Sequence, residues 1–213
     1  MKKRNNSAGI DLLNLEEQIK LFGEKQSWNH CIKLNDKLWT ASPKQNSHGK
    51  NLVKLKRIKK ILPDTILKGA NVLDIGCNEG FFSFEFAKLG VKSVKGIDAD
   101  ELRISKANFV KEILEVPNVN FEKANVYDEL TKEVKYDFAL CLGFLHRIPS
   151  PYDFLTLIQD KADSVLFEWK SPPYEFPHSR NLYWDGINKT NNKYSKAYYR
   201  ISINSLIEMM KEF

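Results

Sequence analysis

Apolar and polar positions along the chain follow two periods, one typical of strands and the other typical of helices. Short apolar, β-prone runs recur through the middle of the chain, and segments with helical spacing separate them. This alternation predicts an α/β fold built on a doubly wound, mainly parallel sheet. The predicted strands lie at residues 72–75, 93–98, 119–127 (with its exit loop), 136–142 and 164–169.

The segment before the first of these strands has a pattern of its own. Capping-box spacing at Asn14 and an apolar stripe predict a helix that ends near Gly23. Two β-prone runs, at residues 28–34 and 37–40, predict a hairpin, and helical spacing returns at residues 51–62. We therefore expect an N-terminal helix and hairpin extension over residues 1–62 and a main domain over residues 63–213.

The stretch from Asp74 to Gly80 reads Asp-Ile-Gly-Cys-Asn-Glu-Gly and joins the first predicted strand to a helix. A dinucleotide-binding loop has a third glycine at the position of Asn78. Two acids, Asp74 and Glu79, would repel a pyrophosphate but suit a ligand whose near end is an ammonium. The loop resembles the first motif of the class I S-adenosylmethionine-dependent methyltransferases. An ordinary glycine-rich turn in an α/β domain is the alternative.

This resemblance implies a Rossmann-like sheet in the order 3-2-1-4-5 and S-adenosylmethionine as the cofactor. Asp98 ends the next strand about 20 residues after the loop, where such folds place a carboxylate that accepts hydrogen bonds from ribose hydroxyls. Its alternative role is to cap the following helix, but Asp100 fills that role. Asn125 stands where the family has an acid that receives the adenine amino group, and an amide oxygen also accepts such a bond. The implied cofactor-binding residues are Asp74, Gly76, Cys77, Asn78, Gly80, Phe81, Asp98, Ala99, Asn125, Val126, Leu142 and Gly143.

The segment from Gly143 to Pro151, together with residues 28–40, is similar to the tRNA wobble-uridine carboxymethyltransferase group. His146 and Arg147 stand where that group has a tyrosine and a histidine. Because the tyrosine helps to hold the extra carboxylate of a carboxylated cofactor, its replacement indicates ordinary methyl transfer. His146 follows the fourth strand and titrates near neutrality, so it is the candidate general base, with a packing role as the alternative. The expected substrate-binding residues are Trp39, Arg147, Tyr183 and Trp184.

Charge is unevenly distributed along the chain, whose net charge is +6. Residues 1–70 hold 15 basic and 6 acidic side chains, whereas residues 71–170 hold 12 basic and 17 acidic ones. A basic extension on an acidic nucleotide fold suggests an anionic partner such as tRNA or another RNA, and the solvated face of a helix is the alternative. Aromatic and basic side chains interleave in residues 171–200, which predicts a loop-rich lid over a base of RNA or over a small molecule.

Composition argues against several other classes. The three cysteines, Cys31, Cys77 and Cys141, lack paired spacing, and the four histidines are scattered, so neither a disulfide framework nor a metal site is expected. No apolar run approaches about 18 residues, and the basic start is not followed by the apolar segment of a secretory signal. The sequence therefore predicts a cytoplasmic protein with no membrane partner.

The last predicted element is a helix from Ile203 to Phe213, capped by Ser202. In class I methyltransferases a sixth and a seventh strand follow this helix, so we expect the sheet to lack them and to leave an apolar edge at residues 164–169. We expect either that the natural protein extends beyond Phe213, or that the N-terminal hairpin, residues 171–200 or a second chain in a homo-oligomer covers that edge.

The predicted function is methyl transfer from S-adenosylmethionine to an oxygen or nitrogen nucleophile, on tRNA, another RNA or a small molecule. Two other classes remain open. A nicotinamide-dependent oxidoreductase shares the sheet but not the loop, and a non-catalytic S-adenosylmethionine-binding subunit would hold the cofactor without an acceptor.

Overall fold

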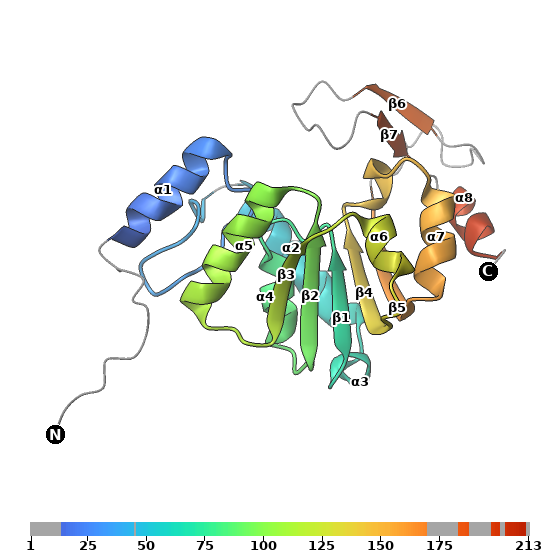
Figure 1. Cartoon of the computed structure of the whole chain (residues 1–213), viewed down its shortest axis with the longest axis horizontal. Coiled ribbons are helices and arrows are strands. Elements are labelled where there is room, and N and C mark those ends of the chain that lie inside the picture. The colour runs from blue at the N-terminus through green and yellow to red at the C-terminus, as the bar shows by residue number, and fades with distance from the viewer. Residues whose placement is uncertain (1–13, 45, 170–182, 188–196, 201–202, 212–213) are drawn as a thin grey trace.

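The computed structural model describes residues 14–44, 46–169, 183–187, 197–200 and 203–211 of the 213-residue chain (Figure 1). A five-stranded parallel sheet in the order β3-β2-β1-β4-β5 lies between two layers of helices, which confirms the predicted fold class and strand order. The strands of this sheet are β1 (Asn71–Ile75), β2 (Ser93–Asp98), β3 (Val119–Lys123), β4 (Tyr136–Leu142) and β5 (Ala162–Glu168).

Helices precede the sheet and connect its strands. Those before β1 are α1 (Leu15–Lys25), α2 (Asn46–Ile61) and α3 (Asp64–Leu67). Those within the αβ repeat are α4 (Phe81–Ala87), α5 (Glu101–Leu114), α6 (Val126–Thr131), the 3₁₀ turn η2 (Leu145–Arg147) and α7 (Pro151–Gln159). None of the helices in the described part of the chain combines the length and the apolar character that a membrane span requires.

The central strands are apolar on both faces because each face packs against a layer of helices. In β4, Leu140 belongs to the core shared with α2, α4 and α5, whereas Ala139 and Cys141 belong to the core shared with α6, α7 and α8 (Ile203–Met210). Alternate side chains of a strand point to opposite faces, so a strand buried on both sides has a nearly continuous apolar run. This is the run that the sequence shows at 136–142.

The strand order places a crevice at one edge of the sheet. All five strands are parallel, so their carboxyl ends lie at the same edge. The chain proceeds from β1 outward to β2 and β3, and then returns to β4 on the other side of β1. In sheets with this reversal, ligands bind outside the carboxyl ends of the strands at the point of reversal.

The N-terminal segment differs from its prediction in detail. The predicted hairpin consists of one isolated antiparallel bridge, between Lys33 and Trp39, closed by the hydrogen bond from the Leu34 N–H to the Leu38 carbonyl. The side chain of Asn14 makes no capping bond, and α2 begins at Asn46 instead of residue 51. The short helix α3 was not predicted. The apolar residues of the N-terminal segment share one core with α4 and α5, and the division at residue 62 stays a prediction.

The segment predicted as a loop-rich lid contains strands. β6 (Tyr183–Ile187) and β7 (Ala197–Arg200) pair antiparallel as a separate sheet, and β7 lies beside η2 (Figure 1). The rest of residues 171–200 lies outside the described residues, and the role of a lid stays a prediction. The final helix is confirmed as α8, which ends at Met210, while the predicted cap Ser202 and the predicted end Phe213 lie outside the described residues. Within the described residues β5 pairs only with β4.

Glycine at position 96 is required by the packing of β2 against β3. A Cβ atom there would lie 2.6 Å from Cδ1 of Phe121 and 3.1 Å from the Cβ of Cys77. We expect Gly96→Ala to lower the free energy of unfolding by about 1–3 kcal/mol through overpacking, measured by urea denaturation. The matched control is Gly49→Ala in α2, where a Cβ would meet no atom within 4 Å. Equal destabilisation by both substitutions would contradict this account.

Candidate functional site

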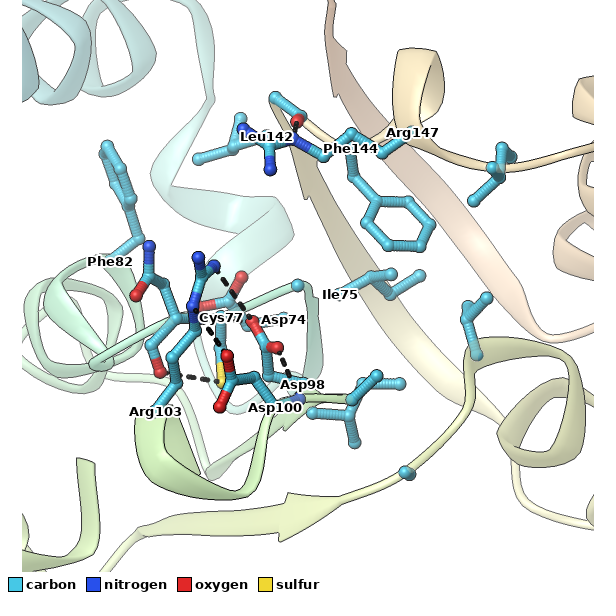
Figure 2. Close-up of a pocket in the computed structure, with 18 of the residues that line it drawn as sticks. Asp74, Ile75, Cys77, Phe82, Asp98, Asp100, Arg103, Leu142, Phe144 and Arg147 are labelled. Atoms are coloured by element: carbon cyan, nitrogen blue, oxygen red, sulfur yellow. Dashed lines mark hydrogen bonds and ion pairs between the residues drawn. The ribbon is translucent and has the colours of Figure 1, made fainter. Parts of the chain in front are cut away.

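A cavity of about 510 Å³ opens at the carboxyl ends of β1, β2 and β4, where the crevice is expected (Figure 2). Its walls come from the loop after β1, the loop after β2, the start of α6 and the segment between β4 and α7. Residues of the N-terminal segment and of α2 complete it. The lining residues used below are Asp74, Gly76, Cys77, Asn78, Asp98, Asn125, Leu142, Gly143, His30, Lys54, Arg103 and Arg147.

The loop after β1 forms the floor of this cavity. The N–H groups of Gly76 and Cys77 both donate to the Ile97 carbonyl, at 2.9 and 3.0 Å, and so tie the loop to the end of β2. Gly76 has a φ of +70°, and a Cβ there would lie 2.9 Å from Cδ2 of Phe144 on the opposite wall. A side chain at this position would therefore strain the backbone and reduce the cavity.

Asp98 joins the loop after β1 to the loop after β2. One oxygen of its carboxylate accepts the Asn78 N–H at 3.1 Å, and the other accepts the Asp100 N–H at 3.0 Å. Burial raises the pKa of Asp98, while Arg103 and these hydrogen bonds lower it. Each oxygen retains a second lone pair and Asp98 lines the cavity, so the carboxylate can accept hydrogen bonds from a ligand.

Asn78 has an unusual conformation and an unused acceptor. Its φ of 56° lies in the left-handed region, where asparagine is better tolerated than most residues. Its side-chain oxygen Oδ1 is buried, and no hydrogen-bond partner for it lies among the described residues. Because Asn78 is one of the residues that line the cavity, this buried acceptor lies beside the site.

Asp74 lies deeper, at the end of β1. It is 3% exposed and accepts a hydrogen bond from the Ser83 hydroxyl. Burial raises the pKa of Asp74 to about 6, and the Ser83 hydrogen bond opposes this shift. A cationic group in the cavity would stabilise the carboxylate that burial destabilises.

Glu79 does not face the cavity, which corrects the expectation that both acids of the loop would meet the ligand. Its side chain is fully buried and accepts the N–H groups of Asn29 and His30, each at 3.1 Å. Lys106 of α5 lies 3.8 Å from Glu79 and donates to the carbonyls of Gln26 and Ser27. Glu79 therefore anchors the N-terminal segment to the loop.

The same anchor places His30 in the cavity wall. Nδ1 of His30 accepts the Phe81 N–H at 3.4 Å, so the proton of the neutral ring lies on Nε2. Burial, with the nearby charges of Arg103 and Lys54, lowers the pKa of His30 to about 3. The imidazole is therefore neutral at physiological pH.

Basic side chains surround the mouth of the cavity. Lys54 of α2 pairs with Glu168 at the end of β5, at 2.9 Å, and Arg103 lies 3.9 Å from Asp98. Arg147 donates from Nε to the Gly143 carbonyl at 3.2 Å. In Figure 2, Arg147 extends over the cavity from the β4 side, and Arg103 faces it from α5.

The structure brings most of the predicted cofactor-binding residues together. Gly80 and Phe81 do not line the cavity: Gly80 caps α4 with a φ of +83°, and Phe81 packs in the core. The Oδ1 atom of Asn125 already accepts the Tyr127 N–H at 3.0 Å as the cap of α6. The predicted residues that line the cavity are Asp74, Gly76, Cys77, Asn78, Asp98, Ala99, Asn125, Val126, Leu142 and Gly143.

The predicted catalytic and substrate residues are more dispersed. Of the described residues, the cavity is lined by Arg147 but not by its neighbour His146, which is 3% exposed. Trp39 packs edge-on against His48, with ring centroids 5.5 Å apart, and is also outside the lining. Tyr183 and Trp184 lie in β6, where the described structure is limited to the backbone. The roles predicted for these residues stay predictions.

The sequence prediction missed His30, Lys54 and Arg103. Arg103 had a usable signal, because it lies one helical turn after Asp100 and five residues after Asp98. His30 and Lys54 lie before the first strand, and only the tertiary contacts of Glu79 and α2 bring them to the cavity. The described residues contain no cluster of three or more His, Cys, Asp or Glu side chains able to hold a metal ion.

Comparison with known proteins finds similarity to methyltransferases over about half of the chain. Residues 66–166 match a family described as a methyltransferase domain. A tRNA U34 carboxymethyltransferase of Campylobacter fetus subsp. fetus is 31% identical over 106 residues, which are 50% of this chain and 36% of that protein. A ubiquinone biosynthesis O-methyltransferase of Neisseria meningitidis serogroup C is 28% identical over 104 residues, 47% of this chain and 44% of that protein. The chain thus spans less than half the length of these two curated relatives.

Solved structures share the fold. The N-terminal domain of EvdMO1 with SAH bound superposes with a TM-score of 0.71 and 17% identity, over 96% of this chain and 88% of that chain. Together with the strand order, this superposition shows that the chain has the fold of class I S-adenosylmethionine-dependent methyltransferases, and residues 66–166 are similar in sequence to a methyltransferase domain.

Asp74 should make stability depend on pH in a defined direction. Its folded pKa of about 6 lies above the ordinary value of 3.8, so its ionisation opposes folding as the pH rises through this window. The free energy of unfolding should therefore fall between pH 4 and pH 7, by an amount on the order of 3 kcal/mol. Asp74→Asn keeps an acceptor for Ser83 and cannot ionise, so its stability relative to the wild type should increase from pH 4 to pH 7. Urea denaturation at both pH values measures this, and a difference that is constant with pH would contradict the raised pKa.

The buried contact between Glu79 and Lys106 should be important for stability. Lys106→Met leaves the carboxylate of Glu79 buried without its cation, so the free energy of unfolding should fall by about 3–5 kcal/mol. The double variant Glu79→Gln, Lys106→Met should recover part of this loss, because no charge remains buried. Lys111→Met, on the same helix with an exposed contact to Asn120, is the control. A double variant less stable than Lys106→Met alone would argue against the anchor.

Proposed function

We propose that this protein binds S-adenosylmethionine in the cavity and transfers its methyl group to an acceptor at the cavity mouth. The observation that carries the proposal is Asp98, whose carboxylate lies at the end of β2, bonded to the loop after β1 and open to the cavity. That arrangement suits a ribose with two adjacent hydroxyls.

The donors and acceptors of the cavity fit the separate parts of this cofactor. Asp98 would hold the ribose, and Asp74 supplies negative charge for the methionine ammonium. The buried Oδ1 of Asn78 adds an acceptor near the same loop. Ala99 and Val126 supply apolar surface for the adenine ring, next to the polar side chain of Asn125. The negative charge of Asp74 also disfavours a pyrophosphate beside this loop, which argues against a nicotinamide cofactor.

When bound, the cofactor supplies a methyl group on a sulfonium, which is an excellent leaving group. The residues of the protein then mainly hold the acceptor at attack distance and angle, an effect worth up to roughly 7–11 kcal/mol. His30, with a pKa of about 3, is a weak base at neutral pH, and we assign its Nε2–H the role of a hydrogen-bond donor. His146 remains our candidate base for an acceptor that must lose a proton.

The acceptor class stays open between RNA and a small molecule. The basic N-terminal segment favours RNA, as in the tRNA-modifying relatives, whereas the enclosed cavity also suits a small acceptor. A cytoplasmic location and a homo-oligomer formed through the edge of β5 stay predictions.

Removal of the Asp98 carboxylate should weaken cofactor binding. We expect Asp98→Ala to reduce the affinity for S-adenosylhomocysteine by about tenfold to a hundredfold, measured by isothermal titration calorimetry, because charged hydrogen bonds contribute about 1.5–3 kcal/mol. The matched control is Asp163→Ala. Asp163 is an exposed acid near the amino end of β5, and the cavity lies at the carboxyl ends of the strands.

Cofactor binding and catalysis are then separated by a transfer assay. Tritiated methyl groups should appear in total tRNA, in a manner sensitive to nuclease, or in a pool of small metabolites. A wild-type protein that binds NAD tightly and S-adenosylhomocysteine weakly would overturn the proposal. Tight cofactor binding with no labelled product in either pool would favour a non-catalytic subunit.

A further inference from the structure

A second, shallower groove of about 480 Å³ adjoins the mouth of the cavity. It lies between α2, the N-terminal segment, α5, and the ends of β4 and β5. Of the described residues that line it, four are basic and one is acidic. These are Lys50, Lys54, Arg103 and Arg147, with Glu168 as the acid.

The pairing of these side chains leaves positive charge unbalanced. Arg103 lies near two carboxylates, at 3.9 Å from Asp98 and 3.7 Å from Asp100, and so is largely compensated. Glu168 pairs with Lys54 at 2.9 Å. For Lys50 and Arg147 the described residues provide no ion pair, and the recorded hydrogen bond of Arg147 uses Nε alone. Among the described residues the remaining guanidinium nitrogens of Arg147 have no recorded partner, and they match the oxygens of a carboxylate or phosphate.

A bound cofactor would not neutralise this groove. S-adenosylmethionine carries one carboxylate, one ammonium and one sulfonium, so its net charge is about +1 at neutral pH. Its carboxylate can satisfy one of the groove cations, but the molecule as a whole adds positive charge to the site. A cleft lined by one sign of charge concentrates ligands of the opposite sign.

We propose that the groove between Lys54 and Arg147 binds an anionic group of the methyl acceptor, a phosphate or a carboxylate, while the cofactor occupies the adjoining cavity. This deepens the proposed function and rests on it. His30, Lys54 and Arg147 line both the cavity and the groove, so the anion would lie beside the position where the two ligands meet. The anion would orient the acceptor toward the cavity without taking part in the transfer.

The test uses inorganic phosphate as the probe and protein saturated with S-adenosylhomocysteine. Phosphate binding, followed by calorimetry at low ionic strength, should weaken about tenfold or more in Arg147→Gln. It should strengthen in Glu168→Gln, because the only acid among the described lining residues is removed. Damage to the fold could lower the affinity for phosphate in Arg147→Gln, but it cannot raise that affinity in Glu168→Gln. The two opposite changes therefore distinguish a role in binding from misfolding. Lys56→Gln, an exposed position of α2 outside the groove, is the control and should change nothing.

Three results would overturn the inference. The first is that the wild-type protein binds S-adenosylhomocysteine but not phosphate. The second is that phosphate competes with S-adenosylhomocysteine, since it would then occupy the carboxylate position of the cofactor. The third is that neither Arg147→Gln nor Glu168→Gln alters phosphate affinity. Failure of the wild type to bind S-adenosylhomocysteine would instead refute the proposed function.

Parallel titrations with phenyl phosphate and a short oligoribonucleotide identify the source of the anion. Tighter binding of phenyl phosphate indicates a small acceptor, and tighter binding of the oligoribonucleotide indicates a nucleic-acid backbone.

Discussion

The site depends on a buried carboxylate that does not line the cavity. Glu79 belongs to the loop after β1, yet its side chain is buried and accepts two backbone N–H groups of the N-terminal segment, beside Lys106. Because an unpaired buried charge is costly, this contact has few alternative arrangements. It fixes the N-terminal segment against the loop, and with it the position of His30. The wall of the cavity and the floor of the cavity are therefore held by the same residue.

The sheet and the floor of the cavity could be predicted from the sequence because their determinants are local. The apolar run of β4 reflects burial on both faces, and the glycine at position 76 reflects a backbone conformation that side chains disfavour. Asp98 follows the loop at a spacing that the βαβ unit fixes. The first two signals lie within the element that they predict, and the third depends on a single βαβ unit.

The rest of the site could not be predicted because it is formed by contacts between distant segments. Glu79 and its partners Asn29 and His30 are about fifty residues apart, and Lys54 and Glu168 are 114 residues apart. Residues 171–200 were predicted as a loop-rich lid because they are rich in aromatic and basic residues, and this composition did not indicate the strands β6 and β7. In the case of Glu79 the motif was correctly located, but the direction of the side chain was not, since a short loop can present an acid to either side.

The charge of the groove has a thermodynamic consequence for the order of events in a catalytic cycle. An anion bound near Arg147 would favour the sulfonium form of the cofactor more than the neutral thioether that remains after transfer, because only the former carries the extra positive charge. Linkage makes this reciprocal: the charged donor would in turn strengthen acceptor binding. Loss of the sulfonium charge would then loosen both ligands together, so that the chemistry itself promotes release of the products.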